Sequence, residues 1–95
     1  MKISELSLGN NRVSLEAIVR RKLGEREVVT RFGKILLREF EIEDESGKVK
    51  LVTWGRKIGS NVNVGDRIRI ENGFVTSFRG ELQLNVGRYG NLEVI

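Results

Sequence analysis

The sequence predicts an all-β fold, a small barrel of five strands in a single domain spanning residues 1–95. Apolar residues alternate with polar ones in most segments, which is the period of a strand with one buried face. Turn residues such as Gly, Asn and Asp separate these segments at short intervals. A chain of 95 residues has no spare length for a second core, so its sheet must close efficiently to be stable.

The first half of the chain contains three of the expected strands. Residues 13–22 and residues 34–43 alternate in this way. The turn sequence DESG at residues 44–47 leads into a third strand at residues 48–54. A long basic connection therefore separates the first strand from the second.

The second half of the chain contains the remaining strands and an insert. Residues 55–65 break the alternation and are long enough for one short helical turn. A fourth strand begins at Arg67 and a fifth at Glu81, which we expect to continue past an interruption at residues 87–90. This layout is typical of the oligonucleotide/oligosaccharide-binding (OB) fold, a Greek-key barrel. An SH3-like barrel is the alternative, and the helical insert after the third strand favours the OB fold.

Composition excludes several classes of function. The chain has no cysteine and no histidine, so disulfides, thiolate metal sites and the usual general base are absent. We therefore expect no catalytic residues, no metal and no cofactor. No apolar run approaches the roughly 20 residues of a membrane span, and the N-terminal residues lack the apolar centre of a secretory signal. An intracellular location without membrane contact is expected.

The charge distribution suits a polyanionic partner without demanding one. Lys and Arg number 17 against 13 Asp and Glu, which gives a net charge of +4. Basic residues are concentrated in residues 20–38, and an acidic block at residues 39–45 follows directly. The simpler interpretation of each run is a solvated strand face or loop.

The segment 71–90 leaves open whether two phenylalanines are buried or displayed. A bulge at Asn72-Gly73 followed by a two-residue loop at Arg79-Gly80 would place Phe74 and Phe78 on the outer face. A three-residue loop would shift the strand pairing by one residue and bury both rings. Arg is not a preferred first residue of a type I′ loop, and the pattern alone does not choose between the two registers.

Three blocks of sequence resemble a known family. They are KVKLVTWG at residues 48–55, VGDRIRIENG at 64–73 and FVTSFRGELQLNVGRYG at 74–90, preceded by EDESG. In this order they resemble the domains of archaeal single-stranded DNA-binding proteins and archaeal replication protein A, over roughly residues 2–95. The resemblance implies an OB fold that binds single-stranded DNA largely independently of sequence and protects it in DNA replication, recombination and repair.

The resemblance also implies a set of binding residues. Three aromatic side chains of the family stack on bases, and the matching positions here are Trp54, Phe74 and Phe78, which favours the displayed register. Phe74 stands where some members have tryptophan, and the flexible acidic tail that some members use to recruit partners is absent from this sequence.

Cationic and amide side chains near these positions complete the expected site. Lys50, Arg56, Arg79 and Arg88 are candidates to contact phosphates, followed by Arg31 and Lys34 in the long loop after the first strand, and Gln83 and Asn85 are candidates to bind base edges or sugars.

Each of these assignments has a simpler alternative. A tryptophan at a strand end is ordinarily buried in the core, and Lys50 has the position of an ordinary surface charge. The Phe32-Gly33 sequence between Arg31 and Lys34 has the form of a hairpin turn. Tyr89 has two equal interpretations, as a cover for the open end of the barrel or as a ligand contact.

Other functions remain as alternatives. An RNA-binding OB domain would differ in its response to the 2′-hydroxyl group, and a protein-interaction module would show no salt-sensitive binding to nucleic acid. An enzyme is disfavoured because alternation sends neighbouring carboxylates of residues 39–45 to opposite faces. The expected partners are single-stranded DNA, with RNA, other replication or repair proteins and further OB domains as additional candidates. The expected location is the cytoplasm, in association with the nucleoid.

Overall fold

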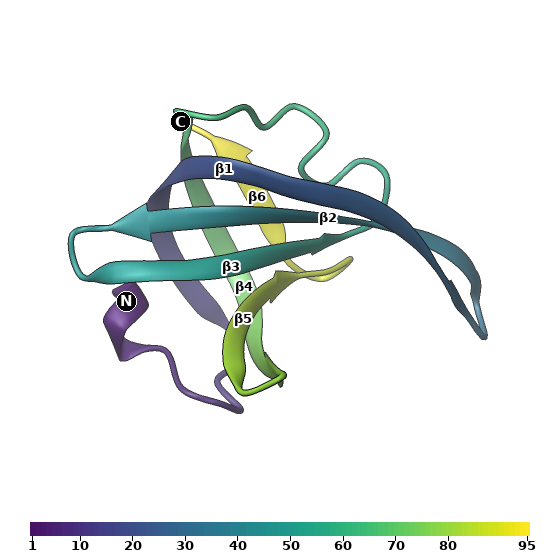
Figure 1. Cartoon of the computed structure of the whole chain (residues 1–95), viewed down its shortest axis with the longest axis horizontal. Helices are drawn as coiled ribbons and strands as arrows, with labels where there is room; N and C mark the ends of the chain where they lie inside the picture. Colours follow the sequence, from purple (N-terminus) through teal and green to yellow (C-terminus); the bar gives the residue numbers. More distant parts are fainter.

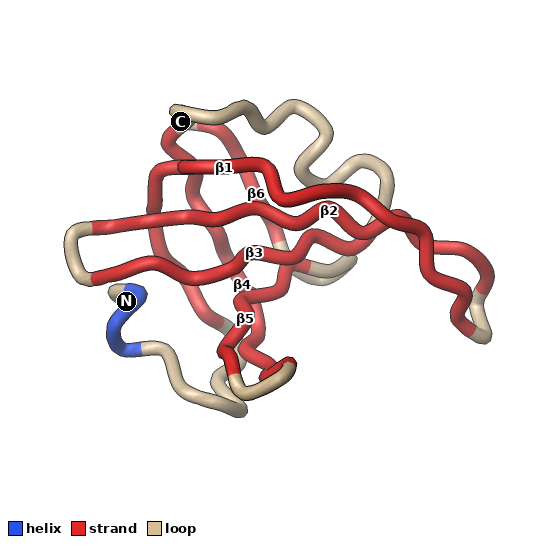
Figure 2. Tube along the Cα trace, in the orientation of Figure 1, coloured by secondary structure: helices blue, strands red, loops and turns tan.

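A computed structural model describes all 95 residues and shows one strongly curved sheet (Figure 1). A short 3₁₀ helix, η1 (Ile3–Glu5), precedes it. The strands are β1 (Val13–Thr30), β2 (Gly33–Asp44), β3 (Gly47–Trp54), β4 (Arg67–Phe78), β5 (Glu81–Val86) and β6 (Asn91–Val94). Strands account for most of the chain, and the longest stretch without regular structure connects β3 to β4 (Figure 2).

Strand pairing closes the sheet into a ring. The order is β1-β2-β3-β5-β4, and β4 also pairs with β1. Only the β3–β5 pairing is parallel, and β6 pairs with β4 beyond the end of β5. This is the ring of the OB fold, so the prediction of an all-β five-stranded OB barrel is confirmed. No helix in the structure has the length and apolarity needed to cross a membrane.

The predicted helical turn between the third and fourth strands is wrong. Residues 55–66 form successive turns instead, and the only helical element is η1. Gly55 and Gly59 have φ values of 121° and 81°, which lie outside the helical region. The segment is fixed by other contacts: Val62 is buried in the core, and Arg38 Nη1 donates to the carbonyl oxygens of residues 55, 56 and 58.

The expected long loop after the first strand is also wrong. β1 continues to Thr30 and pairs with β2 from Gly33, so residues 25–36 form a two-stranded arm that projects from the barrel (Figure 1). Its turn is closed locally, because Thr30 Oγ1 donates to the Gly33 carbonyl and accepts from the Phe32 amide.

The basic and acidic runs of the sequence pair with each other across β1 and β2. Arg21 Nη2 lies 2.8 Å from Glu41, and further ion pairs join Arg20 to Glu43 and Arg26 to Glu39. The hydrogen bond and charge of Arg21 lower the pKa of the Glu41 carboxyl. The beginning of the basic run on β1 therefore faces the acidic run on β2, and much of the basic charge is neutralised within the molecule.

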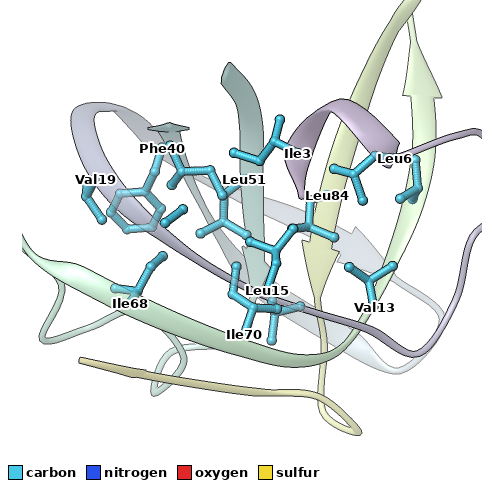
Figure 3. Close-up of a cluster of buried hydrophobic side chains, with 14 of the residues drawn as sticks. Ile3, Leu6, Val13, Leu15, Val19, Phe40, Leu51, Ile68, Ile70 and Leu84 are labelled. Carbon is cyan, nitrogen blue, oxygen red and sulfur yellow. The ribbon is translucent and has the colours of Figure 1, made fainter. Parts of the chain in front are cut away.

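The core fills the inside of the ring. Inward side chains of all five barrel strands meet there, with Ile3 and Leu6 from the N-terminal segment (Figure 3). Phe40, Ile42 and Leu51 are among its largest fully buried side chains. One continuous apolar cluster therefore forms the core inside the ring.

Asp44 ties the N-terminal segment to the β2–β3 turn. Its Oδ2 accepts from the Ile3 amide at 2.9 Å, and its Oδ1 accepts from the Ser46 amide at 2.7 Å. Burial alone raises the pKa of Asp44, but the hydrogen bonds from Ser46, Ile3 and Gly47 outweigh it, and the pKa lies below its ordinary value.

The lowered pKa of Asp44 predicts an acid-sensitive contact. Because the folded pKa is below the unfolded one, these bonds stabilise the fold above about pH 4, and the stabilisation is lost as pH falls through the folded pKa. Urea unfolding at a series of pH values should show that Asp44→Asn is less stable than the wild type at neutral pH and loses less stability on acidification. Glu45→Gln, an exposed neighbour, should follow the wild type. A loss on acidification in Asp44→Asn as large as in the wild type would exclude this role.

Candidate nucleic-acid interface

A bulge in β4 changes which side chains of this strand face outward. From the pair Leu15–Ile70 to the pair Val13–Gly73, β4 advances three residues while β1 advances two. The bulge includes Asn72, whose φ of 58° lies in the left-handed region that Asn tolerates better than most residues. The alternation of β4 is therefore shifted by one residue beyond this point.

The β4–β5 hairpin keeps the shifted register. Phe78 pairs with Glu81, so Arg79-Gly80 is a two-residue loop, and its φ values of 54° and 82° are those of a type I′ turn. Phe74 and Phe78 project from the outer face, where they are 38% and 50% exposed. Of the two registers that the sequence left open, the structure has the displayed one.

Trp54, Phe74 and Phe78 form what we call the aromatic platform. Trp54 ends β3 and donates from its indole Nε1 to Asn85 Oδ1 at 3.0 Å. Asn85 is the β5 partner of Phe74, so its side chain connects the Trp54 and Phe74 positions across β5. Phe78 lies four residues further along β4, a separation of about 13 Å at the usual rise of a strand. The rings therefore offer successive surfaces along one face.

A groove runs beside the first two rings of the platform. Its lining includes Trp54, Phe74, Thr76, Arg12, Arg88 and Tyr89. None of its lining residues is Asp or Glu, whereas four other grooves on the surface are each lined by one to four acidic side chains. This groove therefore combines apolar rings with uncompensated positive charge.

Two of the predicted phosphate contacts are held in ion pairs. Lys50 Nζ lies 3.1 Å from Glu39, and Arg56 Nη2 lies 3.2 Å from Glu27 of the arm. Lys50 is beside the platform because it pairs with Gln83 of β5. Both cations face a carboxylate of this chain before any ligand is present.

Arg79 and Arg88, unlike Lys50 and Arg56, have no carboxylate partner. Neither takes part in any of the ion pairs of the structure. The Arg79 guanidinium lies 5.1 Å from the centre of the Phe78 ring, and that of Arg88 lies 5.0 Å from the centre of Tyr89. These contacts are cation–π interactions, which leave the positive charge available to an anion.

Arg31 and Lys34 are not brought to the platform. They lie at the tip of the arm on either side of Phe32, and Arg31 lies 5.2 Å from the centre of that ring. The simpler interpretation of their sequence, a hairpin turn, is the one that the structure has.

Asn85 does not have the exposure expected of a base contact. It is 2% exposed, and its side chain is fully engaged within the protein. Besides accepting from Trp54, it donates from Nδ2 to Thr76 Oγ1 at 2.9 Å and to the carbonyl oxygens of Phe74 and Gln83. The expectation that Asn85 is displayed is therefore wrong, because its Oδ1 accepts from the Trp54 indole and its Nδ2 hydrogens are used by acceptors on β4 and β5. Gln83 is half-buried and stays on the outer face.

Nine of the twelve residues that line the groove were not among the predicted contacts. They include Arg12, Ile35 and Thr76, together with Tyr89, for which a ligand contact was one of two open interpretations. Arg12 precedes the first strand and reaches the groove only because β1 pairs with β4. Ile35 lies in the second predicted strand, at residues 34–43, and it belongs to the arm in the structure. Thr76 lies two residues from both Phe74 and Phe78 in β4, so alternation places the three side chains on the same face, and the sequence could have predicted this contact. The structure contains no group of three or more acidic, histidine or cysteine side chains placed to hold a metal ion.

Comparisons with known proteins agree with this geometry. Residues 13–92 match the family described as OB-fold nucleic acid binding domain. A single-stranded DNA binding protein of Saccharolobus solfataricus is 40% identical over 62 residues, which are 65% of this chain and 41% of that protein. Replication factor A of Methanothermobacter thermautotrophicus is 33% identical over 63 residues, 66% of this chain and 8% of that protein. The chain thus spans less than half the length of these relatives.

A solved structure is similar over the whole chain. The replication factor A related protein from Methanobacterium thermoautotrophicum superimposes with a TM-score of 0.85 at 25% sequence identity. The match covers 100% of this chain and 89% of that one.

The contacts of Asn85 predict that it positions Trp54. In Asn85→Ala the indole N–H loses its acceptor and the Phe74 carbonyl and Thr76 hydroxyl lose a donor, so the free energy of unfolding should fall by about 1–3 kcal/mol. Trp54 emission in the folded state should also shift, because the ring is no longer held over β5. Urea unfolding and emission spectra measure both effects, with half-buried Gln83→Ala as the matched control on the same strand. Unchanged stability and an unchanged spectrum would contradict a positioning role.

Proposed function

This chain belongs to the family of OB-fold nucleic acid binding domains and is related to archaeal single-stranded DNA-binding proteins and replication protein A, and we propose that it binds single-stranded DNA. The resemblance read from its sequence motifs is thereby confirmed. The observation that carries the proposal is the outward aromatic platform beside a groove without carboxylates.

The proposed mechanism is base stacking supported by phosphate contacts. Every base has a π-face, so each of Trp54, Phe74 and Phe78 can hold a base with about 1–3 kcal/mol. Arg79 and Arg88, which have no carboxylate partner, are the first candidates to contact phosphates. Lys50 and Arg56 join them by exchanging a carboxylate for a phosphate. At the exposed pair of Arg56 with Glu27 this exchange costs little, because exposed ion pairs contribute about 0–1 kcal/mol, whereas the pair of Lys50 with Glu39 is partly buried.

We expect the domain to have little preference for DNA sequence, because few polar side chains beside the platform are free to bind base edges. Asn85 uses its amide inside the protein, so Gln83 and Thr76 are the polar side chains nearest the platform that remain for base edges. Stacking itself is tolerant of base identity. A domain of this kind can cover and protect exposed single strands in DNA replication, recombination and repair, which we propose as its role.

We further propose that residues 1–95 act as one binding domain in the cytoplasm, associated with the nucleoid. The curated relatives are longer than this chain, which agrees with further OB domains or partner proteins acting beside it. RNA has the same bases and phosphates, so discrimination against it depends on the 2′-hydroxyl group.

The proposal predicts selective, salt-dependent binding. Titration with single-stranded DNA should quench the emission of Trp54, the only tryptophan, whereas duplex DNA of equal length should bind far more weakly because its bases already stack on each other. With three to five phosphate contacts, log K should fall against log salt with a slope of roughly −2 to −3.5. The same titration with RNA of the same sequence measures the preference between DNA and RNA. Equal affinity for duplex, or a flat salt response, would contradict the proposal, and a preference for RNA would reassign the ligand.

Truncation of the platform predicts loss of binding without loss of folding. Phe74→Ala or Phe78→Ala should each lower affinity by roughly five-fold to a hundred-fold, while thermal unfolding changes little because the rings are displayed. Leu84→Ala is the matched control: this leucine is fully buried, so its truncation should cost about 2–5 kcal/mol of stability. Phenylalanine variants that unfold as easily as the leucine variant, or that bind like the wild type, would exclude the platform.

A further inference from the structure

The groove beside the platform extends past Phe74 to a surface that the three stacking rings do not use. Arg12, Arg88 and Tyr89 line this end of it. Tyr89 is 77% exposed. Because Tyr89 shares one groove with Trp54 and Phe74, it belongs to a contiguous exposed apolar surface, and such a surface marks an interaction site.

The Tyr89 ring is presented by a fixed turn. The Gly90 amide donates to the Gly87 carbonyl at 2.9 Å and closes the turn between β5 and β6. Asn72 Nδ2 donates to the Tyr89 carbonyl at 2.7 Å and ties the turn to the bulge of β4. The turn is thus anchored to the strand that carries Phe74 and Phe78, so the position of Tyr89 relative to the platform is set by the fold.

Arg12 supplies the second cation of this end of the groove. It is exposed and takes part in none of the ion pairs of the structure. Its φ of 55° is in the left-handed region, where a residue other than Gly costs roughly 1–2 kcal/mol. Gly or Asn would fit this backbone with less strain, so the presence of Arg here is better explained by its charge than by the turn.

We propose that Arg12, Arg88 and Tyr89 form a further nucleotide subsite, which adds one nucleotide to the strand bound by the aromatic platform. The base would stack on Tyr89 and the phosphate would lie against the two guanidinium groups. This inference rests on the proposed function. The subsite would receive the end of the bound DNA that extends past Phe74.

Two comparisons within the molecule favour a nucleotide as the occupant. The pair of Tyr89 with Arg88 repeats the pair of Phe78 with Arg79 at the far end of the platform, with ring distances of 5.0 Å and 5.1 Å. The groove also runs without a break from Trp54 and Phe74 to Tyr89 and has no acidic lining residue. A ligand with both aromatic rings and negative charge fits this combination.

A length series of oligo(dT) tests the subsite. Wild-type affinity should rise with each added nucleotide until all subsites are filled. In Tyr89→Ala the rise should stop one nucleotide earlier, and affinity for the longer oligonucleotides should fall by roughly five-fold to a hundred-fold. Tyr89→Phe keeps the ring and should bind like the wild type.

Arg12→Asn tests the phosphate contact, since Asn tolerates a positive φ. Its affinity should fall only for oligonucleotides long enough to reach the subsite, and its salt slope should be smaller by about 0.7. Arg67→Asn is the matched control, because Arg67 is an exposed, unpaired arginine that lines a different groove rich in carboxylates. It should change neither the length dependence nor the slope by a comparable amount.

The outcomes separate this inference from the proposed function. If Tyr89→Ala and Arg12→Asn bind every length like the wild type while Trp54 emission is still quenched, the subsite is refuted and single-stranded DNA binding stands. If wild-type Trp54 emission does not respond to any oligonucleotide at saturation in a separate binding assay, the platform itself is refuted. The melting temperature of Tyr89→Ala should match the wild type, and that of Arg12→Asn should be equal or higher because Asn relieves backbone strain. A lowered melting temperature in either variant would show that the residue serves the fold.

Discussion

The bulge at Asn72 in β4 is the constraint on which the interface depends. Before it, Ile68 and Ile70 face the core; after it, Val75 does, and Phe74 and Phe78 face outward. Gly73 fits the site because a Cβ there would lie 3.1 Å from the Asn85 carbonyl oxygen. Asn72 also holds the Tyr89 carbonyl. One extra residue in one strand therefore sets the face of two rings and the place of a third aromatic side chain.

The outer face of the sheet has one region in which most charges are paired and one in which positive charge is unpaired. The net charge of +4 does not show this difference. Across β1, β2 and β3 most cations are paired with carboxylates, as in the pair of Lys50 with Glu39. Beside Trp54 and Phe74 the groove has arginines and no carboxylate. An anion placed at random meets a nearly neutral surface over the first region and uncompensated charge over the second. The carboxylates of β2 thus restrict the positive field to the side of the sheet that has the rings.

The strands, the OB barrel and the three platform rings were predictable because alternation and motif order are local signals. The arm was missed because residues 23–33 are rich in charge and do not alternate clearly, so they look like a basic loop when they are read along the chain. The helical turn at 55–65 was predicted from length alone, and its glycines and the carbonyl contacts of Arg38 exclude it. Asn85 was misjudged because its partner Trp54 is 31 residues away in sequence. The alternation of β5 placed Asn85 on the outer face of the sheet. Only the folded sheet shows that the amide oxygen of Asn85 accepts a hydrogen bond from the Trp54 indole.

Exposed rings on a small domain are a hazard for solubility, and arginines at the turns offset it. Phe32, Phe78 and Tyr89 each have the guanidinium of an adjacent arginine within 5.0–5.2 Å of the ring centre. At an exposed site such a contact contributes about 0.5–1 kcal/mol, whereas a stacked base contributes about 1–3 kcal/mol. A base can therefore displace the guanidinium with a net gain. Under the proposed function, the displaced Arg79 would stay beside the Phe78 ring, within reach of the phosphate of the same nucleotide, so the group that shields this ring in the free protein would become a contact in the complex.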